Sequence, residues 1–427
     1  MPDLSPELLP KLKAHRIPDL DLGSNFQYPD YLGGSILNLP GSVCSLLGVP
    51  RFGAPPLRDE ILTKLGGPYQ RVVFLLVDAL AFHRMQAWMQ EPEFAVWRQL
   101  AGDGLLAPLT SVSPSTTSAA LTSLWTGRAP GEHGIAGYEL WLKEYGLVAN
   151  MIAHAPFSFE RQAGSLSHAG FVPRDFLGLP TLGPHLTAHG VNAYAFQHYG
   201  ILGSGLSDLF FPEVKRNGYL SHSDLWIGLR QLMELQSAQR AFYWVYYADV
   251  DTLSHKYGPD DERVHAEFAA FSQAFERHFL FRLTPDVRKD TLFILAADHG
   301  QIHTEKDPHY ELRNHPNLTR RLHMQPTGEN RLIYLFVKPG QTEAVREYIE
   351  RTWPNQFAIL ESAFAQEAGL FGPGPSSPRL AERLGDLILV AKGNAYLWWN
   401  LKENPLIGRH GGLALEEMLV PLVAARL

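Results

Sequence analysis

Three apolar segments of the chain end in acidic residues, and two of these segments carry a histidine close by. The segments are 71–77, 241–251 and 291–300, and the polar residues at their ends are Asp78, Asp249, Asp251, His255, Asp298 and His299. Apolar runs of this length are typical of strands buried on both faces of a parallel sheet. Because the carboxyl ends of parallel strands lie at one edge, the sequence predicts that these side chains gather where open α/β sheets bind ligands.

The residue types at this edge indicate a metal site. Asp251 and His255 are four residues apart, so one helical turn would place both on the same side. Asp298 and His299 are adjacent at a strand-to-loop turn, where both side chains can reach one centre. Mixed carboxylate and imidazole ligands suit Zn²⁺ or Mn²⁺, whereas Ca²⁺ and Mg²⁺ favour oxygen ligands. There are more ligands than one tetrahedral ion needs, which predicts a pair of divalent ions of the kind that serves phosphoryl transfer.

A hydroxyl cluster, residues 115–118, follows Pro114 and opens a helix expected over 118–126. Free N–H groups and the positive end of the helix dipole would favour an anion there. Thr117 is predicted to lie against one ion, to attack phosphorus and then to be released by hydrolysis. A single Asp after a strand, or a single hydroxyl cluster, more often caps a helix. The hypothesis therefore depends on their combination.

Strands that alternate with helices predict a three-layer α/β/α sandwich with a mostly parallel central sheet. The organisation that we expect is an N-terminal arm packed on the core at 1–70, an α/β core at 71–314 and 381–427, and a small α+β cap insertion at 315–380.

Three further segments have expected structures of their own. We expect a single helix over 82–99, long loops over one face at 136–189, and a solvated loop carrying the histidines between 303 and 323. In the loops, packing is the expected role of aromatic side chains such as Tyr138, with stacking on a substrate ring as the alternative.

Composition restricts the partners of this protein. The chain of 427 residues carries 37 Lys and Arg against 44 Asp and Glu, a net charge of −7, which argues against binding a nucleic acid polymer. A small phosphorylated substrate, with a nucleotide as one candidate, remains compatible because a metal inverts the local charge. The single cysteine, Cys44, excludes an internal disulfide. The N-terminal residues do not resemble a signal peptide and no stretch has the length of a membrane span, so we expect a cytoplasmic protein without a membrane partner.

Five segments of the chain resemble the type I phosphodiesterase/nucleotide pyrophosphatase family of the alkaline phosphatase superfamily. They occur in the family's order between residues 71 and 412, and they read LLVDAL, PSTTSAALTSLWTGRAPGEHGI, DVDTLSHKYGP, AADHG and GRHGG. The TG-x-x-P-x-x-HGI tail and the D-x-x-x-H-x-x-GP segment are the specific parts.

The resemblance implies two-metal hydrolysis of a phosphodiester or phosphoanhydride through a phosphothreonine on Thr117, with zinc as the metal and manganese as the alternative. One ion would be held by Asp251, His255 and His410, and the other by Asp78, Asp298, His299 and the Thr117 oxygen. His410 is selected by the GRHGG match, and Asp249 is left as a structural acid.

The sequence departs from the family at two positions. Many members have Gly where this chain has Ala79, and many have an Asn that helps to hold a phosphoryl oxygen where it has Ala120. The metal ligands are thus complete, while another group must replace that Asn. Two alternatives stay open: a phosphomonoesterase of the same superfamily, which would need a phosphate clamp such as an arginine that Arg128, two residues past the helix, does not obviously supply, and a non-catalytic metal-binding protein on this fold.

Overall fold

A seven-stranded sheet forms the core of the protein. The computed structural model describes residues 3–158 and 162–427. The strand order is β2-β16-β9-β1-β8-β6-β7, and β16 runs against the other six strands, so the prediction of a mostly parallel sheet is confirmed. The strands are β1 (Arg71–Val77), β2 (Leu105–Thr110), β6 (Asn192–His198), β7 (Lys215–Tyr219), β8 (Ala241–Tyr247), β9 (Thr291–Ala296) and β16 (Leu419–Arg426).

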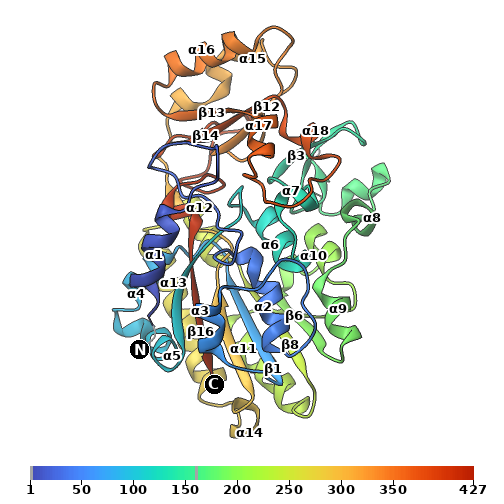
Figure 1. Cartoon of the computed structure of the whole chain (residues 1–427), viewed down its shortest axis with the longest axis vertical. Helices are drawn as coiled ribbons and strands as arrows, with labels where there is room; N and C mark the ends of the chain where they lie inside the picture. Colours follow the sequence, from blue (N-terminus) through green and yellow to red (C-terminus); the bar gives the residue numbers. More distant parts are fainter. Residues whose placement is uncertain (1–2, 159–161) are drawn as a thin grey trace.

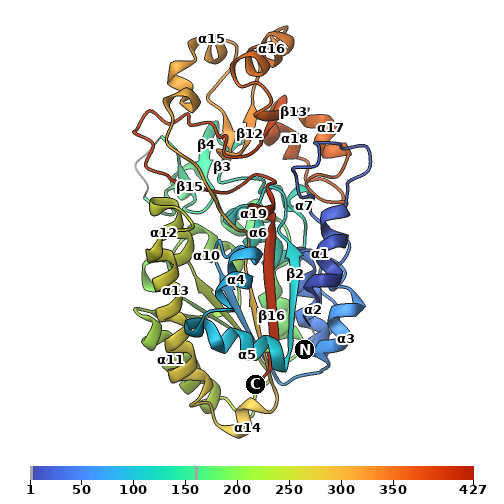
Figure 2. The same cartoon turned by 90° about the vertical axis from the view of Figure 1, so that its left-hand side faces the viewer.

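Helices cover both faces of this sheet (Figures 1 and 2). On one face lie α4 (Phe82–Trp88), α5 (Ala95–Asp103), α11 (His222–Leu235) and α13 (Glu262–Phe275). On the other lie α1 (Ser5–Ala14), α2 (Leu39–Leu46), α3 (Asp59–Leu65), α6 (Thr117–Thr126) and α9 (Leu182–Ala188), so the first 70 residues contribute three helices that pack on the core. The three-layer α/β/α architecture follows from this arrangement.

The central strand β1 is buried because aromatic side chains cover it. All seven of its residues are buried. Phe74 of β1 stacks on Trp244 of β8, with 5.2 Å between the ring centroids, and Trp125 of α6 packs against Trp244 at the same distance. A strand covered in this way has no solvated face, which is why its sequence is apolar throughout.

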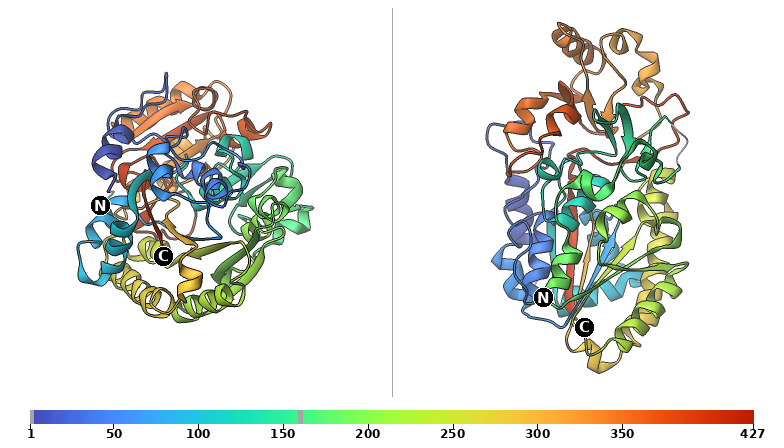
Figure 3. Two further views of the ribbon diagram at one scale, coloured as in Figure 1. Left: turned by 60° about the horizontal axis from the view of Figure 1, so that its bottom comes forward. Right: turned by 90° about the vertical axis from the view of Figure 1, so that its right-hand side faces the viewer.

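A second sheet stands beyond the carboxyl edge of the first, at the top of Figure 1. It is antiparallel, with the order β13-β14-β12-β11-β3-β4-β5. Its strands are β3 (Glu139–Leu142), β4 (Leu147–Asn150), β5 (Ala155–Pro156), β11 (Thr327–Gly328), β12 (Leu332–Leu335), β13 (Phe357–Glu361) and β14 (Leu387–Ala391). Figure 3 (right) shows this sheet and its helices on the core, with the teal strands beside the orange ones.

This sheet draws on more of the chain than the expected insertion. Residues 315–380 supply β11, β12 and β13, whereas β14 and the β3–β5 meander come from outside that range. The prediction of long loops over 136–189 is therefore wrong for 139–156, because β3 pairs with β11, which lies nearly 190 residues further along the chain. Its helices are α15 (Pro316–Thr319), α16 (Thr342–Thr352), α17 (Ser362–Glu367) and α18 (Leu380–Leu384).

Shorter elements complete the fold. They are α7 (Pro130–His133), α8 (Pro173–Leu177), α10 (Gly205–Phe210), α12 (Asp249–Tyr257), α14 (Pro285–Arg288), α19 (Leu415–Met418), and the paired strands β10 (Ile302–His303) and β15 (Gly408–Arg409).

Two local expectations are wrong. The helix expected over 82–99 is two helices, α4 and α5, because Pro92 starts a separate 3₁₀ turn between them. The histidines between 303 and 323 are not all solvated: His315 is buried, hydrogen-bonds Tyr348 (2.9 Å) and packs on Trp353. No helix among the described residues has the length and apolarity that crossing a membrane requires.

Candidate active site

Asp78 and Asp298 lie side by side because they follow β1 and β9, which are neighbours in register. The Ala79 N–H donates to Asp298 Oδ1 (3.2 Å), which ties the two strand ends together. Ala79 has φ +61°, a left-handed conformation that costs a non-glycine residue about 1–2 kcal/mol. Gly300 has to be glycine, since a Cβ there would lie 2.0 Å from the Glu416 carbonyl oxygen. The backbone that follows each of the two acids is therefore tightly constrained.

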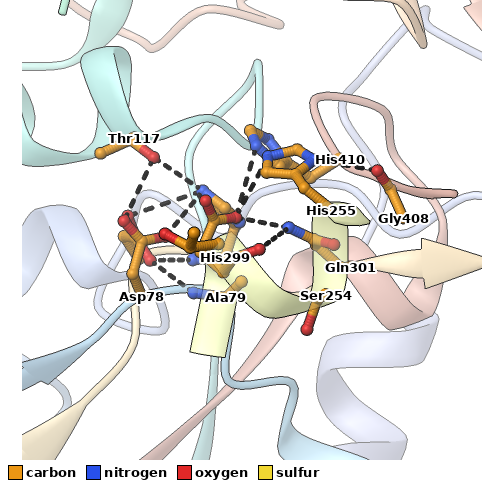
Figure 4. A network of polar contacts seen from close by, with 12 residues as sticks. Asp78, Ala79, Thr117, Ser254, His255, His299, Gln301, Gly408 and His410 are labelled. Atoms are coloured by element: carbon orange, nitrogen blue, oxygen red, sulfur yellow. Dashed lines mark hydrogen bonds and ion pairs between the residues drawn. The ribbon is translucent and has the colours of Figure 1, made fainter. Parts of the chain in front are cut away.

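Thr117 is the first residue of α6, and its hydroxyl faces the two strand ends. Its Oγ1 lies 3.5 Å from Asp78 Oδ2 and 3.1 Å from His299 Nε2 (Figure 4). The neighbouring Thr116 is extended, and its hydroxyl lies beside Glu329 instead. Of the two threonines, Thr117 is thus the one whose oxygen reaches the strand-end acids.

Asp251 and His255 lie one turn apart on α12, with His255 Nε2 3.3 Å from Asp251 Oδ1. His410 follows β15 and places its Nε2 3.8 Å from the same Asp251 oxygen. Gly408 of β15 packs so closely on α12 that a Cβ there would lie 2.2 Å from the Ser254 carbonyl oxygen. This close packing brings together residues that are more than 150 positions apart in the chain.

The three histidines all keep Nε2 available for a metal. In each ring Nδ1 contacts a backbone carbonyl, which can only accept, so Nδ1 carries the proton and Nε2 keeps its lone pair. The carbonyls belong to Gly408 for His255 (2.9 Å), to Gly300 for His299 (3.0 Å) and to Ser115 for His410 (3.1 Å). Such contacts also fix the orientation of the rings.

The carboxyl groups at this site lack a compensating cation. Burial raises the pKa of Asp78, Asp251 and Asp298, and the neighbouring Asp298 and Asp251 raise that of Asp78 further. Among the described residues, no lysine or arginine forms an ion pair with any of the three. Asp78 Oδ1 and Asp298 Oδ2 are buried without a hydrogen-bond donor within the same part of the structure. Divalent cations would satisfy these oxygens and offset the charge.

The atoms that could bind a metal form two overlapping groups. Within each group all atoms lie within 4.8 Å of one another, and the groups are Asp251, His299 and His410, and Asp78, Asp298 and His299. His299 lies between them, and its ring stacks on that of His410 with 3.8 Å between centroids. Burial lowers the pKa of both of these histidines, so both rings are neutral at pH 7. The donor set fits zinc or manganese.

Two residues that sequence reasoning missed hold the acids in place. Tyr246 of β8 donates its hydroxyl hydrogen bond to Asp78 Oδ2, and the Gln301 amide donates to Asp251 Oδ1. Gln301 directly follows the AADHG segment, and this position is the signal that could have identified it. Tyr246 is one of several aromatic residues in a buried strand, and nothing in its sequence context distinguishes it.

A cavity of about 340 Å³ opens beside Thr117. The core contributes Thr117, Asp251, His255 and His410 to its walls, and the opposite walls come from the second sheet and residues 398–406. Tyr138 lines this cavity, although packing in a loop was its expected role.

The other singled-out residues lie elsewhere. Asp249 groups with His222 and Glu267, apart from the two overlapping groups. Arg128 pairs with Glu132 (3.6 Å) and does not line the cavity. Ala120 is fully buried and belongs to the hydrophobic core.

Comparisons with known proteins agree with this geometry. The family model of type I phosphodiesterase / nucleotide pyrophosphatase matches residues 72–413. A search of curated protein sequences finds no significant match.

Solved structures share the fold at low sequence identity. Murine ectonucleotide pyrophosphatase/phosphodiesterase 5 is similar with a TM-score of 0.62 and 15% identity, over 83% of this chain and 87% of that chain. The human protein of the same name has a TM-score of 0.62 and 13% identity, over 83% of this chain and 87% of that chain. Phosphonoacetate hydrolase from Sinorhizobium meliloti 1021 gives 0.60 and 15%, over 83% of this chain and 89% of that chain. The chain therefore belongs to the type I phosphodiesterase/nucleotide pyrophosphatase family and is a hydrolase of the phosphodiesterase/pyrophosphatase type.

Proposed function

We propose that this protein hydrolyses phosphodiester or phosphoanhydride bonds through a phosphothreonine intermediate on Thr117, with two zinc ions as cofactors and manganese as the alternative. The observation that carries the proposal is the position of Thr117 Oγ1, 3.1 Å from His299 Nε2 and 3.5 Å from Asp78 Oδ2. A hydroxyl at a helix N-terminus, next to buried acids that lack a counter-charge, is placed for nucleophilic attack on a bound phosphoryl group.

The residues divide between two ions. One ion would be held by Asp78, Asp298 and His299 beside the Thr117 oxygen, and the other by Asp251, His255 and His410. When bound, the ions would supply Lewis-acid stabilisation of the charge on the phosphoryl and leaving oxygens.

The chain itself performs a two-step displacement. Thr117 Oγ1 attacks phosphorus, a bond between phosphorus and Oγ1 forms, and the bond to the leaving oxygen breaks. Asp78 Oδ2 is the carboxylate oxygen toward which the Thr117 hydroxyl donates. Water then attacks phosphorus, the bond to Oγ1 breaks and Thr117 is restored. Backbone N–H groups in the first turn of α6 are available to the phosphoryl oxygens throughout.

Two structural neighbours support a small phosphorylated substrate. An inactive threonine-to-alanine variant of the murine protein has been solved in complex with AMP. The Sinorhizobium hydrolase has been solved with phosphonoacetate. A nucleotide is therefore one candidate substrate for the present chain.

The test compares a 4-nitrophenyl phosphodiester with 4-nitrophenyl phosphate, using zinc-loaded protein. We expect faster hydrolysis of the diester, and Thr117→Ala should lower kcat at least roughly a thousandfold while the circular dichroism spectrum stays unchanged. Thr116→Ala is the matched control: it removes the adjacent hydroxyl and should leave kcat close to that of the wild type. Activity retained in Thr117→Ala would refute the nucleophile assignment, and a preference for the monoester would change the function to a phosphomonoesterase.

A further inference from the structure

The cavity beside Thr117 has walls that the proposed reaction does not use. Its far side is built by the second sheet and by the segment after residue 397, and the side chains there are Tyr138, Glu139, Phe157, Glu329, Trp398 and Trp399. A group esterified to a phosphorus atom at Thr117 would extend into this space. These residues are therefore placed to select the substituent that the phosphoryl group carries.

Glu139 and Glu329 are buried carboxyl groups in this cavity. Each is 8% exposed, and both line the cavity wall. The Trp399 indole N–H donates to Glu139 Oε2 (2.8 Å), while Glu329 accepts from the Tyr138 backbone N–H (2.7 Å, to Oε1) and lies beside the Thr116 hydroxyl. Within residues 3–158 and 162–427, neither carboxyl group has a lysine or arginine partner. Because an ionised carboxyl group offers about four lone pairs, each of the two keeps acceptor capacity for a ligand.

The neighbouring basic residue is not their counter-ion. Arg409 also lines the cavity, but its guanidinium donates to Thr304 Oγ1 and Asn404 Oδ1 and lies 3.7 Å over the ring of Tyr396. Burial raises the pKa of both Glu139 and Glu329 to about 8, and Glu329 adds to the shift of Glu139. A cation in the cavity would lower both pKa values and restore the charged carboxylates.

Aromatic rings complete the environment of the two carboxyl groups. Trp398, Trp399, Tyr138 and Phe157 all line the same cavity. An aromatic ring attracts a cation near its face, and this attraction is larger where water is excluded. Buried acceptors together with aromatic rings favour a positively charged organic group over a neutral or anionic one.

We propose that this cavity binds a primary alkylammonium group carried by the substrate, with Glu139 and Glu329 accepting its N–H hydrogen bonds. The inference rests on the proposed function, since it assigns the substituent of the phosphodiester that Thr117 attacks. Of the three ammonium donors, two match the two carboxyl groups, and the third is left for water or for a further polar atom of the wall.

The test uses two probes of the same shape, 4-nitrophenyl 2-aminoethyl phosphate and 4-nitrophenyl propyl phosphate, which differ in an ammonium and a methyl group. With zinc-loaded protein at pH 7.5, kcat/KM should be roughly tenfold or more higher for the amine. Glu139→Gln and Glu329→Gln should each bring the ratio of kcat/KM for the amine to kcat/KM for the propyl probe toward one. Glu267→Gln, a half-buried acid outside the cavity, is the matched control and should keep the wild-type ratio. Equal values for both probes in the wild type would overturn the inference and leave phosphodiester hydrolysis standing.

A failure of the proposed hydrolytic function can be distinguished from a failure of the cavity assignment. If neither probe is hydrolysed, calorimetry decides the inference with 2-aminoethyl phosphate and propyl phosphate as ligands of the zinc-loaded protein. Binding of the amine at least roughly tenfold tighter, and lost in Glu329→Gln, would support the cavity assignment without any turnover. Equal affinity for the two ligands would overturn it.

Discussion

Replacing Glu329 by Gln should remove part of the pH dependence of the free energy of unfolding. Burial raises the pKa of Glu329 from 4.5 to about 8 in the folded protein. A group with a raised folded-state pKa contributes stability that is fully present below pH 4.5 and is lost as the pH rises through about 8. The wild-type protein therefore loses this contribution across the neutral range, whereas the neutral amide of the Glu329→Gln variant does not titrate.

The size of the effect follows from proton linkage. Between the two pKa values the folded state holds one proton more than the unfolded state, so the free energy of unfolding falls by roughly 1.4 kcal/mol per pH unit. Over the interval from pH 4.5 to about 8 the difference amounts to at most about 5 kcal/mol. The Gln amide keeps an acceptor for the Tyr138 N–H, and any cost of burying its NH₂ group is the same at every pH.

The assay is urea denaturation of chelator-treated wild type and Glu329→Gln at pH 5, 6, 7 and 8. The free energy of unfolding of the variant minus that of the wild type should rise with pH. The contribution of buried histidines cancels in this difference because both proteins contain them. Glu382→Gln is the control: its hydrogen bond with Lys143 holds the pKa of Glu382 below 4.5, so its difference from the wild type should stay flat over this range. A flat or falling difference for Glu329→Gln would refute the assignment of a protonated, buried carboxyl group.

Three further results are expected. Gln301→Leu removes the amide that donates to Asp251, so zinc affinity should fall roughly 10–100-fold in competition with a chromophoric chelator, and unchanged affinity would contradict this role. Arg331→Met leaves Glu417 buried without the partner that donates to it at 2.7 and 3.0 Å. The free energy of unfolding in urea should then drop by about 3–5 kcal/mol, and a loss below about 1 kcal/mol would show that the pair is not needed. Removal of metal should abolish hydrolysis and lower Tm, with both restored by zinc, whereas full activity at zero metal by elemental analysis would exclude a metal-dependent reaction.

The strand-end acids were predictable from the sequence because a local rule and a topological rule agree. A run that is buried on both faces has to be apolar, so its first acid marks the end of the strand, and parallel neighbours end at one edge. Asp78 and Asp298 meet for this reason, since β1 and β9 are adjacent and in register. Asp251 and His255 followed from helical spacing, and they lie one turn apart on α12. His410 depended on the family motif, because no local pattern connects it with residues so far away in the chain.

The cavity walls could not be predicted, because they depend on pairing between distant segments. Glu139 lies opposite Gly328 through the β3–β11 pair, and Glu329 follows directly. In the sequence each is one acid among 44 Asp and Glu, and neither belongs to a recognisable motif. The buried state that distinguishes them is produced by tertiary packing alone. The same reason applies to Tyr246 and His315, whose partners belong to other elements.

The division between the two sheets implies that reaction and specificity are built from separate parts of this protein. The predicted metal ligands all come from the core edge and from the loop after β15, whereas the two cavity carboxyls come from the second sheet. The two parts must nevertheless keep a fixed distance, since a phosphoryl group at Thr117 and its substituent in the cavity belong to one molecule. The buried pair of Arg331 beside β12 and Glu417 of α19 supplies such a link, and Glu417 also accepts N–H groups from the loop that carries His410. Loss of this pair should therefore lower discrimination between the two probes together with stability, because it connects the cavity wall to the metal-ligand loop.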